Sequence, residues 1–350
     1  ALHDLIESGD LPQPRRTLHF VWPDEFDGTY EFLRRDPGFV QRLAVNINMD
    51  MVSEALRKNN AVFAMSETPA HLASFFDGLA YAVMDYVWRT NDIVYPYPVS
   101  PRDRSGGQYY PRPLWEKNGT KDAFRFYTHE TTGASDHEVF NGPAVGVPGV
   151  QFFVWPDQWY HADKDLPENG DPTGMRRVAF IGAATGWASA NLSDDMVPAL
   201  LDAVSDFGYD RVAERAIPST MECLDGGGDA AMAWHILSAG LDREMDAVRS
   251  VNEISTGSAR ATALVEARLT EWEGYRKGLE TFLLQAAEAR GFPDLAVPGP
   301  SAAEQAARDL IPSLAEGIRG QVFSLPGFGM MQKYEREHPG TIGELGLSPS

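Results

Sequence analysis

The sequence predicts an α/β fold followed by a helical region, on the basis of three observations. Residues 43–47 alternate large apolar side chains with small or polar ones, which is typical of a strand. Residues 150–154 are almost entirely apolar, which is typical of a strand buried on both faces. Beyond about residue 190 the apolar spacing is helical throughout, most clearly over 258–290. We therefore predict an α/β domain over 1–195 and a helical C-terminal extension over 196–350.

Taken in order, each predicted element has a local signal for its start or end. A helix over 2–8 should end at Gly9, and the strand Thr17–Trp22 should end at Pro23. The next strand should end near Asn48. Helices should begin at Thr68-Pro69 and at Asp171-Pro172, because each pair places a capping side chain before a proline.

Later segments carry weaker signals. In the helix over 258–290, Gly274 and Gly278 predict close approach of a neighbouring element. The aromatic segment 91–127 predicts an ordered loop over the mouth of a site. A last helix is expected over 301–319.

Composition limits the kinds of partner. With 350 residues, 43% of them hydrophobic, the chain can bury a large core. A formal net charge of −20 argues against a nucleic acid or an anionic membrane surface as partner, since both attract basic proteins. The single cysteine, Cys223, excludes a disulfide within the chain.

Polar residues bracket the buried strand at 150–154. Before it runs Ser135-Asp136-His137-Glu138-Val139-Phe140, and after it come Tyr160-His161 and Asp165. Two further acidic groups follow predicted strands, Asp24-Glu25 after Trp22 and Asp50 after Asn48-Met49. Because α/β proteins keep their chemistry in loops at strand ends, we expect these groups to form one site.

These strings resemble, in their order, motifs of the M28 family of zinc aminopeptidases. The resemblance covers about residues 10–190 and implies the second half of a catalytic domain, with a three-layer α/β/α fold and a mixed sheet of the zinc-exopeptidase type. The strands ending near Trp22, Asn48 and Val154 should be neighbours in that sheet. It also implies a metallo-exopeptidase that acts on peptides.

Residue roles follow from the same resemblance. Glu25, Asp50 and His161 match metal ligands, Asp24 matches the general base and Tyr160 matches a donor to the oxyanion. Asp136 and Asp165 match positions that support the ligands. The intact site of the family binds two zinc ions. Its His-x-Asp ligand pair precedes the Asp24-Glu25 position and would fall ahead of Ala1, in which case this chain holds one ion or none.

Three alternatives remain open. Glutaminyl cyclases share the fold, although Tyr160 stands where those enzymes carry tryptophan. A peptidase-like domain without metal could serve as a binding or assembly module, which Asp rather than Glu at position 24 favours. The C-terminal helices could also form a homo-oligomer through Trp272 and Tyr275.

Overall fold

The computed structural model describes residues 2–91, 113–226, 230–254 and 258–292. The predicted helix over 301–319 and most of the predicted loop over 91–127 lie outside these residues. The described helices and strands are α1 (Leu2–Glu7), α2 (Asp27–Arg35), α3 (Pro37–Val40), β1 (Asn46–Met49), α4 (Leu56–Asn59), β2 (Val62–Ser66), α5 (Phe75–Thr90), β3 (Phe126–His129), α6 (His137–Asn141), β4 (Gly149–Trp155), α7 (Pro172–Asn191), α8 (Val197–Arg211), α9 (Ile217–Asp225), α10 (Ala230–Ser250) and α11 (Ala259–Ala289).

A mixed sheet of four strands, in the order β1-β4-β2-β3, carries the site. β4 runs parallel to β1 and antiparallel to β2, and β2 runs parallel to β3. Two of its strands, β1 and β4, confirm the strands predicted from residues 43–47 and 150–154. Two others, β2 and β3, were not predicted.

The predicted strand Thr17–Trp22 is wrong, because these residues form no strand and pair with no neighbour. Phe20 and Trp22 are 70% and 85% exposed. The segment has the composition of a strand, but a strand also needs a ladder partner, and β1 lies across a cavity from it.

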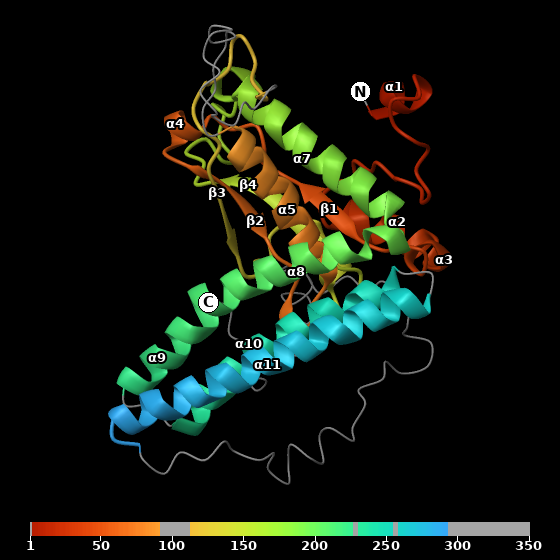
Figure 1. The fold of residues 1–350 in the computed structure, drawn as a ribbon. Helices are drawn as coiled ribbons and strands as arrows, with labels where there is room; N and C mark the ends of the chain where they lie inside the picture. The colour runs from red at the N-terminus through yellow and green to blue at the C-terminus, as the bar shows by residue number, and fades with distance from the viewer. Residues whose placement is uncertain (1, 92–112, 227–229, 255–257, 293–350) are drawn as a thin grey trace, which may run out of the picture.

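Helices α5 and α7 lie across one face of the sheet (Figure 1). Alternate residues of β4 point into this side, where Val150, Phe152 and Val154 join the main core. A smaller cluster around Leu33, Val40 and Val139 joins α2, α3 and α6. The mixed sheet and the helices agree with the predicted α/β class.

Helix α5 begins later than predicted, with Ser74 as its N-cap rather than Thr68. Thr68 instead binds the first turn of α5 from outside. Its N–H and its hydroxyl each donate to the Asp77 carboxylate, at 2.9 Å. The predicted cap at Asp171 is confirmed, since its side chain accepts the N–H of Thr173 at the start of α7.

The chain after α7 is helical in its described part. α8 continues through a π-helical turn, Val212–Ala216, into α9, and α10 and α11 pack beside them (Figure 1). Trp272 is fully buried and stacks on Tyr209 at 4.4 Å. It is therefore part of the core of this chain and offers no exposed surface to a second copy.

The two helical glycines of α11 differ from their prediction. Nothing lies within 4 Å of a Cβ built at Gly274 or Gly278, so no neighbour within the described chain approaches them closely. The close approach occurs at Gly78 in α5, where such a Cβ would lie 2.6 Å from Val204 Cα in α8.

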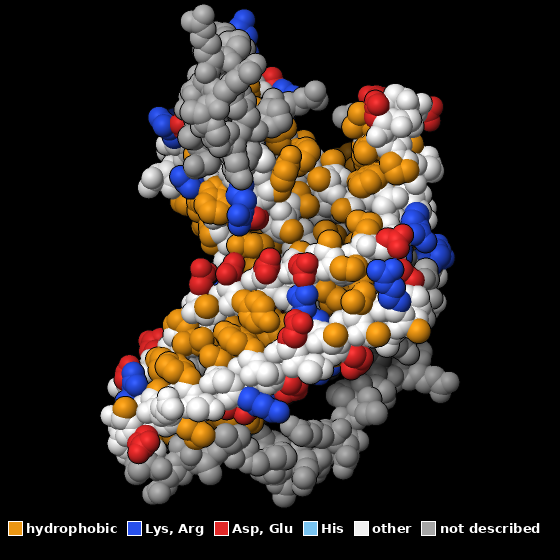
Figure 2. All heavy atoms as spheres, viewed as in Figure 1, with side chains coloured by type: hydrophobic (Ala, Val, Ile, Leu, Met, Phe, Trp, Pro, Cys, Tyr) orange, Lys and Arg blue, Asp and Glu red, His pale blue; other side chains and the backbone are white. Residues whose placement is uncertain are grey.

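The outer face of α8 carries acidic side chains along its length (Figure 2). Asp202, Asp206 and Asp210 are exposed and repeat at four-residue spacing. None of the described helices combines the length and the hydropathy needed to cross a membrane.

Candidate active site

The Glu25 loop is held in a strained turn. The N–H of Asp27 donates to the carbonyl of Glu25 at 2.7 Å, and the residue between them, Phe26, has φ 57° and ψ −71°. This geometry is the classic γ-turn, which is rare because it crowds the side chain of the central residue. The N–H of Phe26 donates to Asp136 Oδ1 at 2.8 Å, which anchors the turn to a distant part of the chain.

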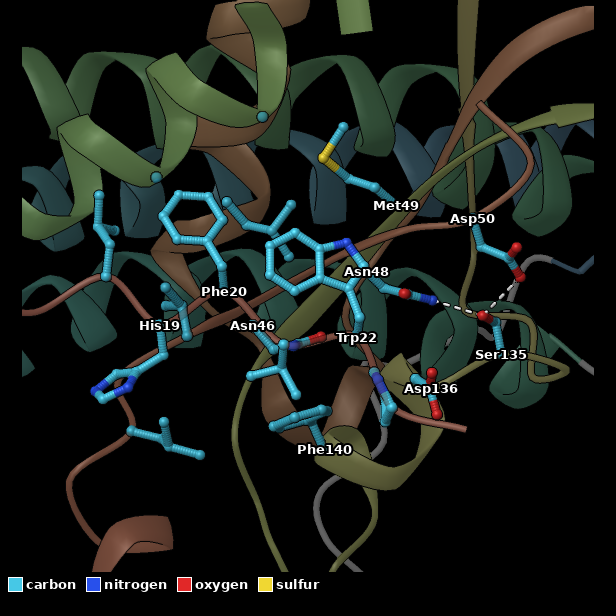
Figure 3. Close-up of a pocket in the computed structure, with 18 of the residues that line it drawn as sticks. His19, Phe20, Trp22, Asn46, Asn48, Met49, Asp50, Ser135, Asp136 and Phe140 are labelled. Carbon is cyan, nitrogen blue, oxygen red and sulfur yellow. Dashed lines mark hydrogen bonds between the residues drawn. The ribbon is translucent and has the colours of Figure 1, made fainter. Parts of the chain in front are cut away.

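Asp50 follows the last residue of β1 and lies beside Ser135 (Figure 3). The Ser135 hydroxyl donates to Asp50 Oδ2 at 2.8 Å, and Asn48 Nδ2 donates to Ser135 Oγ at 2.7 Å. The N–H of Asp50 donates to the carbonyl of Phe152 in β4 at 3.2 Å. Both the backbone and the side chain of Asp50 are therefore fixed.

Tyr160 and His161 lie in the loop that follows β4. Their rings stack with centroids 3.8 Å apart, and Tyr160 contacts Trp155 edge to face at 5.6 Å. Tyr160 is 44% exposed, and His161 is exposed as well. Both side chains are accessible to a ligand.

One cavity, of about 1050 Å³, brings most of the predicted site residues together. The predicted residues that line it are Glu25, Asp50, Asp136, Tyr160, His161 and Asp165. Ser135 and Asp157 line it too, whereas Asp24 does not. The cavity extends between β1, α7 and the exposed segment around Phe20 and Trp22, which Figure 3 shows projecting over β1.

The acidic groups of the cavity influence one another. Partial burial raises the pKa of Glu25, and the negative charges of Asp50 and Asp136 raise it further. A hydrogen bond with Ser135 and the charge of His161 act in the opposite direction. A cationic group is therefore favoured at this end of the cavity, because it would relieve the repulsion among the carboxylates.

Left-handed backbone conformations cluster at this site. Five non-glycine residues of the described chain have positive φ, and four of them are Phe26, Met51, Ala134 and His161. These residues are, or directly adjoin, Glu25, Asp50, Ser135 and His161. Because each such conformation costs about 1 kcal/mol or more, it persists where the surrounding structure holds it, which is often at a functional site.

The predicted ligands do not form a metal site in this conformation. No group of three or more His, Cys, Asp or Glu side chains among the described residues is placed to hold a metal ion. The donor types suit zinc, but Glu25, Asp50 and His161 are not arranged as a metal-binding group in the described structure.

His137 is a structural residue here. It is fully buried, and its Nε2 donates to the carbonyl of Thr132 at 2.7 Å. Burial lowers its pKa, which keeps the ring neutral. Its Nδ1 has no hydrogen-bond partner in the described structure.

The model of peptidase family M28 matches residues 9–185, which is half of the 350-residue chain. The chain belongs to peptidase family M28. The matched residues contain the whole candidate active site and the four-stranded sheet. No curated protein and no solved structure matches the chain.

The sequence analysis gave no role to Ser135 or Asn48. Both stand within the strings quoted for the family, yet a serine and an asparagine are common in loops and at strand ends, where most bind only local backbone. Their hydrogen bond to each other joins residues 87 positions apart, which a single sequence does not reveal.

Proposed function

We propose that this M28 chain is an aminopeptidase that removes N-terminal residues from peptides. The single observation that supports this proposal best is the cavity that Glu25, Asp50, Tyr160 and His161 share. A free peptide N-terminus is an ammonium ion, and the acidic end of the cavity has the complementary charge. The exposed apolar residues along the rest of the cavity suit the side chains of a peptide.

Zinc belongs to this proposal, because members of family M28 are generally zinc-dependent. Glu25, Asp50 and His161 are the proposed ligands. Since these side chains do not form a metal site as described, binding requires the loop that carries His161 to approach Glu25 and Asp50. His161 is exposed on a loop, so this movement disturbs no packed core.

The chain's own residues supply two further roles. The Tyr160 hydroxyl is proposed to donate a hydrogen bond to the carbonyl oxygen as negative charge develops there. Asp24 is proposed to accept a proton from the attacking water and to return it to the leaving amine as the C–N bond breaks. Because Asp24 does not line the cavity, this second role also requires a change in the loop before the γ-turn.

The test is the release of a chromogenic amine from aminoacyl substrates, with and without added zinc. We expect His161→Ala to lower kcat/KM about a thousandfold or more, since the Lewis acid supplies several kcal/mol to the transition state. Tyr160→Phe keeps the ring that stacks on His161 and removes only the hydroxyl, so a loss of about a hundredfold is expected. His235→Ala, on α10 and away from the cavity, is the control.

Two outcomes contradict this proposal. One is full wild-type activity after removal of all metal, and the other is a His161→Ala protein that turns over normally. Peptide binding without hydrolysis, in the presence of zinc, would instead support a peptide-binding module. Release of a cyclised N-terminal glutamine derivative would support a glutaminyl cyclase.

A further inference from the structure

We propose that a peptide substrate binds in extended form along the open edge of β1, as an added antiparallel strand of the sheet. This inference rests on the proposed function for the identity of the ligand. It adds how the peptide is recognised, which is through its main chain over several residues and not through its N-terminal residue alone.

One edge of β1 is unpaired among the described residues. β1 is an end strand of the sheet, and its single neighbour in the sheet is β4. The N–H groups of Asn46 and Asp50 donate to carbonyls in or beside β4, at 2.9 and 3.2 Å. In a parallel ladder, alternate residues direct both N–H and carbonyl to one neighbour, and the residues between them direct both the other way. The backbone groups of Ile47 and Met49 therefore point away from β4, and both residues line the cavity.

The segment Thr17–Trp22 forms the opposite wall of this part of the cavity. The N–H of Arg16, just before it, donates to a carbonyl in the last turn of α7 at 3.0 Å. A Cβ built at Gly186 in α7 would lie 3.7 Å from the side chains of both Leu18 and Ile47, so both segments rest on the same turn of α7. We call the part of the cavity bounded by Thr17–Trp22, β1 and α7 the slot (Figure 3).

The slot has the chemistry that an extended peptide needs. An edge strand offers a row of N–H and carbonyl groups, which is the template to which a peptide adds as a further strand. Ala179 and Ala183 of α7 line the cavity with small side chains, and Phe20 and Trp22 offer apolar surface that is 70% and 85% exposed. The whole cavity, at about 1050 Å³, has room for several residues of a peptide.

Charge sets the direction of the peptide in the slot. β1 runs from Asn46 to Met49 and leads into Asp50, so the acidic groups of the cavity lie at its C-terminal end. The ammonium group of a peptide is attracted to that end. The rest of the peptide then runs back along β1 toward Asn46, which makes it antiparallel to β1, and alternate amides of the peptide face Ile47 and Met49.

The experiment measures binding of the pentapeptide amide Leu-Thr-Leu-Thr-Leu by calorimetry, with metal removed by a chelator so that the peptide is not cleaved. The same peptide is also tested with an acetylated N-terminus, and with a single N-methyl group on each of its four internal amides in turn. Two variants are compared with the wild type. Ala183→Phe places a ring in the slot from an exposed position of α7, and Ala263→Phe makes the same change at an exposed position of α11, away from the cavity.

We expect N-methylation to weaken binding about tenfold at every second amide and to change it little at the amides between, because only alternate N–H groups donate to β1. Acetylation should weaken binding about tenfold, since it removes the ammonium charge. Ala183→Phe should weaken binding about tenfold or more by filling the slot, whereas Ala263→Phe should bind as the wild type does.

Equal losses at all four amides, or no loss at any, would overturn the inference. So would a wild-type protein that does not bind the pentapeptide, or a crystal structure in which a strand of a second copy or of another protein fills the slot. Binding with the alternating pattern but without hydrolysis when zinc is added would contradict the proposed function and support this inference. If Ala183→Phe does not fold, the methylated peptides, tested on the wild type, still decide the question.

Discussion

Backbone strain at single residues marks the candidate site more clearly than composition does. Glu25, Asp50 and His161 differ in residue type and come from three loops, yet each is, or adjoins, a left-handed residue. A sequence does not show this feature, since Phe, Met, Ala and His are not residues that favour positive φ. The M28 resemblance located the motifs, and the structure adds that their loops are held in uncommon conformations.

Ala134, at φ 79°, allows the strain to be measured at an exposed position. We expect Ala134→Gly to raise the free energy of unfolding by up to about 1 kcal/mol, because glycine adopts this conformation without a steric penalty. Ala267→Gly, at an exposed position inside α11, should lower it by about 1 kcal/mol. Chemical denaturation of both variants gives the comparison. A loss of stability in Ala134→Gly equal to that in Ala267→Gly would contradict the proposed strain.

Helix–helix contacts in this fold depend on which glycine faces a neighbour. Gly78 and Gly274 both lie inside helices, and a sequence pattern treats them alike. The structure separates them, since a Cβ at Gly78 would meet the backbone of α8 and one at Gly274 would meet nothing within the described residues.

This difference predicts opposite effects of the same substitution. Gly78→Ala should lower the free energy of unfolding by roughly 1–3 kcal/mol, because the new methyl group must push α5 and α8 apart. Gly274→Ala should raise it by about 1 kcal/mol through the higher helix propensity of alanine. Thermal unfolding monitored by circular dichroism measures both. A destabilised Gly274→Ala protein would show that this face of α11 is covered, and repeating the scan at several protein concentrations would reveal a second copy there.

The elements predicted from sequence were those with a strong periodic pattern. Helix α11 extends over eight turns of regular spacing, and β4 is a continuous apolar run, so both were found. β2 and β3 have only five and four residues, and β3 follows a segment rich in proline and aromatic side chains. The strand predicted at Thr17–Trp22 was wrong for a different reason. The segment has the composition of a strand, but composition does not guarantee a pairing partner. In the site, the motif spacing identified most of the acidic and aromatic residues discussed for the cavity. It also gave Asp24, which does not line the cavity, and it did not reveal the hydrogen bonds between the residues.

On the scale of the whole molecule, a buried ion network joins the sheet to the C-terminal helices. Glu67, at the end of β2, and Asp77, in α5, are fully buried and accept hydrogen bonds from Arg211 at 3.2 and 3.0 Å. Arg215 and Arg243 also bind Glu67, and Glu244 binds Arg211. Three arginines and three carboxylates thus balance in charge. The division of the chain at residue 195 stays a prediction, and any such division would cut between these partners.

Burial alone would raise the pKa of Glu67, but Arg211 and Arg215 outweigh it and lower that pKa. Removing Arg211 should therefore leave carboxylates buried with too little compensation. We expect Arg211→Leu to lower the free energy of unfolding by roughly 3–5 kcal/mol. Arg249→Leu removes an ion pair whose two side chains are 50% and 59% exposed, and should cost about 1 kcal/mol or less. Urea denaturation compares the two, and similar losses would contradict the assigned role of the network.

The network also constrains the order of events during synthesis. Glu67 and Asp77 are synthesised well before Arg211, Arg215 and Arg243. Both carboxylates are therefore present in the nascent chain before their arginine partners. Until α8 and α10 emerge, these carboxylates must stay hydrated, because a buried carboxylate without a partner is strongly unfavourable. We therefore expect the end of β2 and the start of α5 to close only after the chain up to about residue 243 has left the exit tunnel.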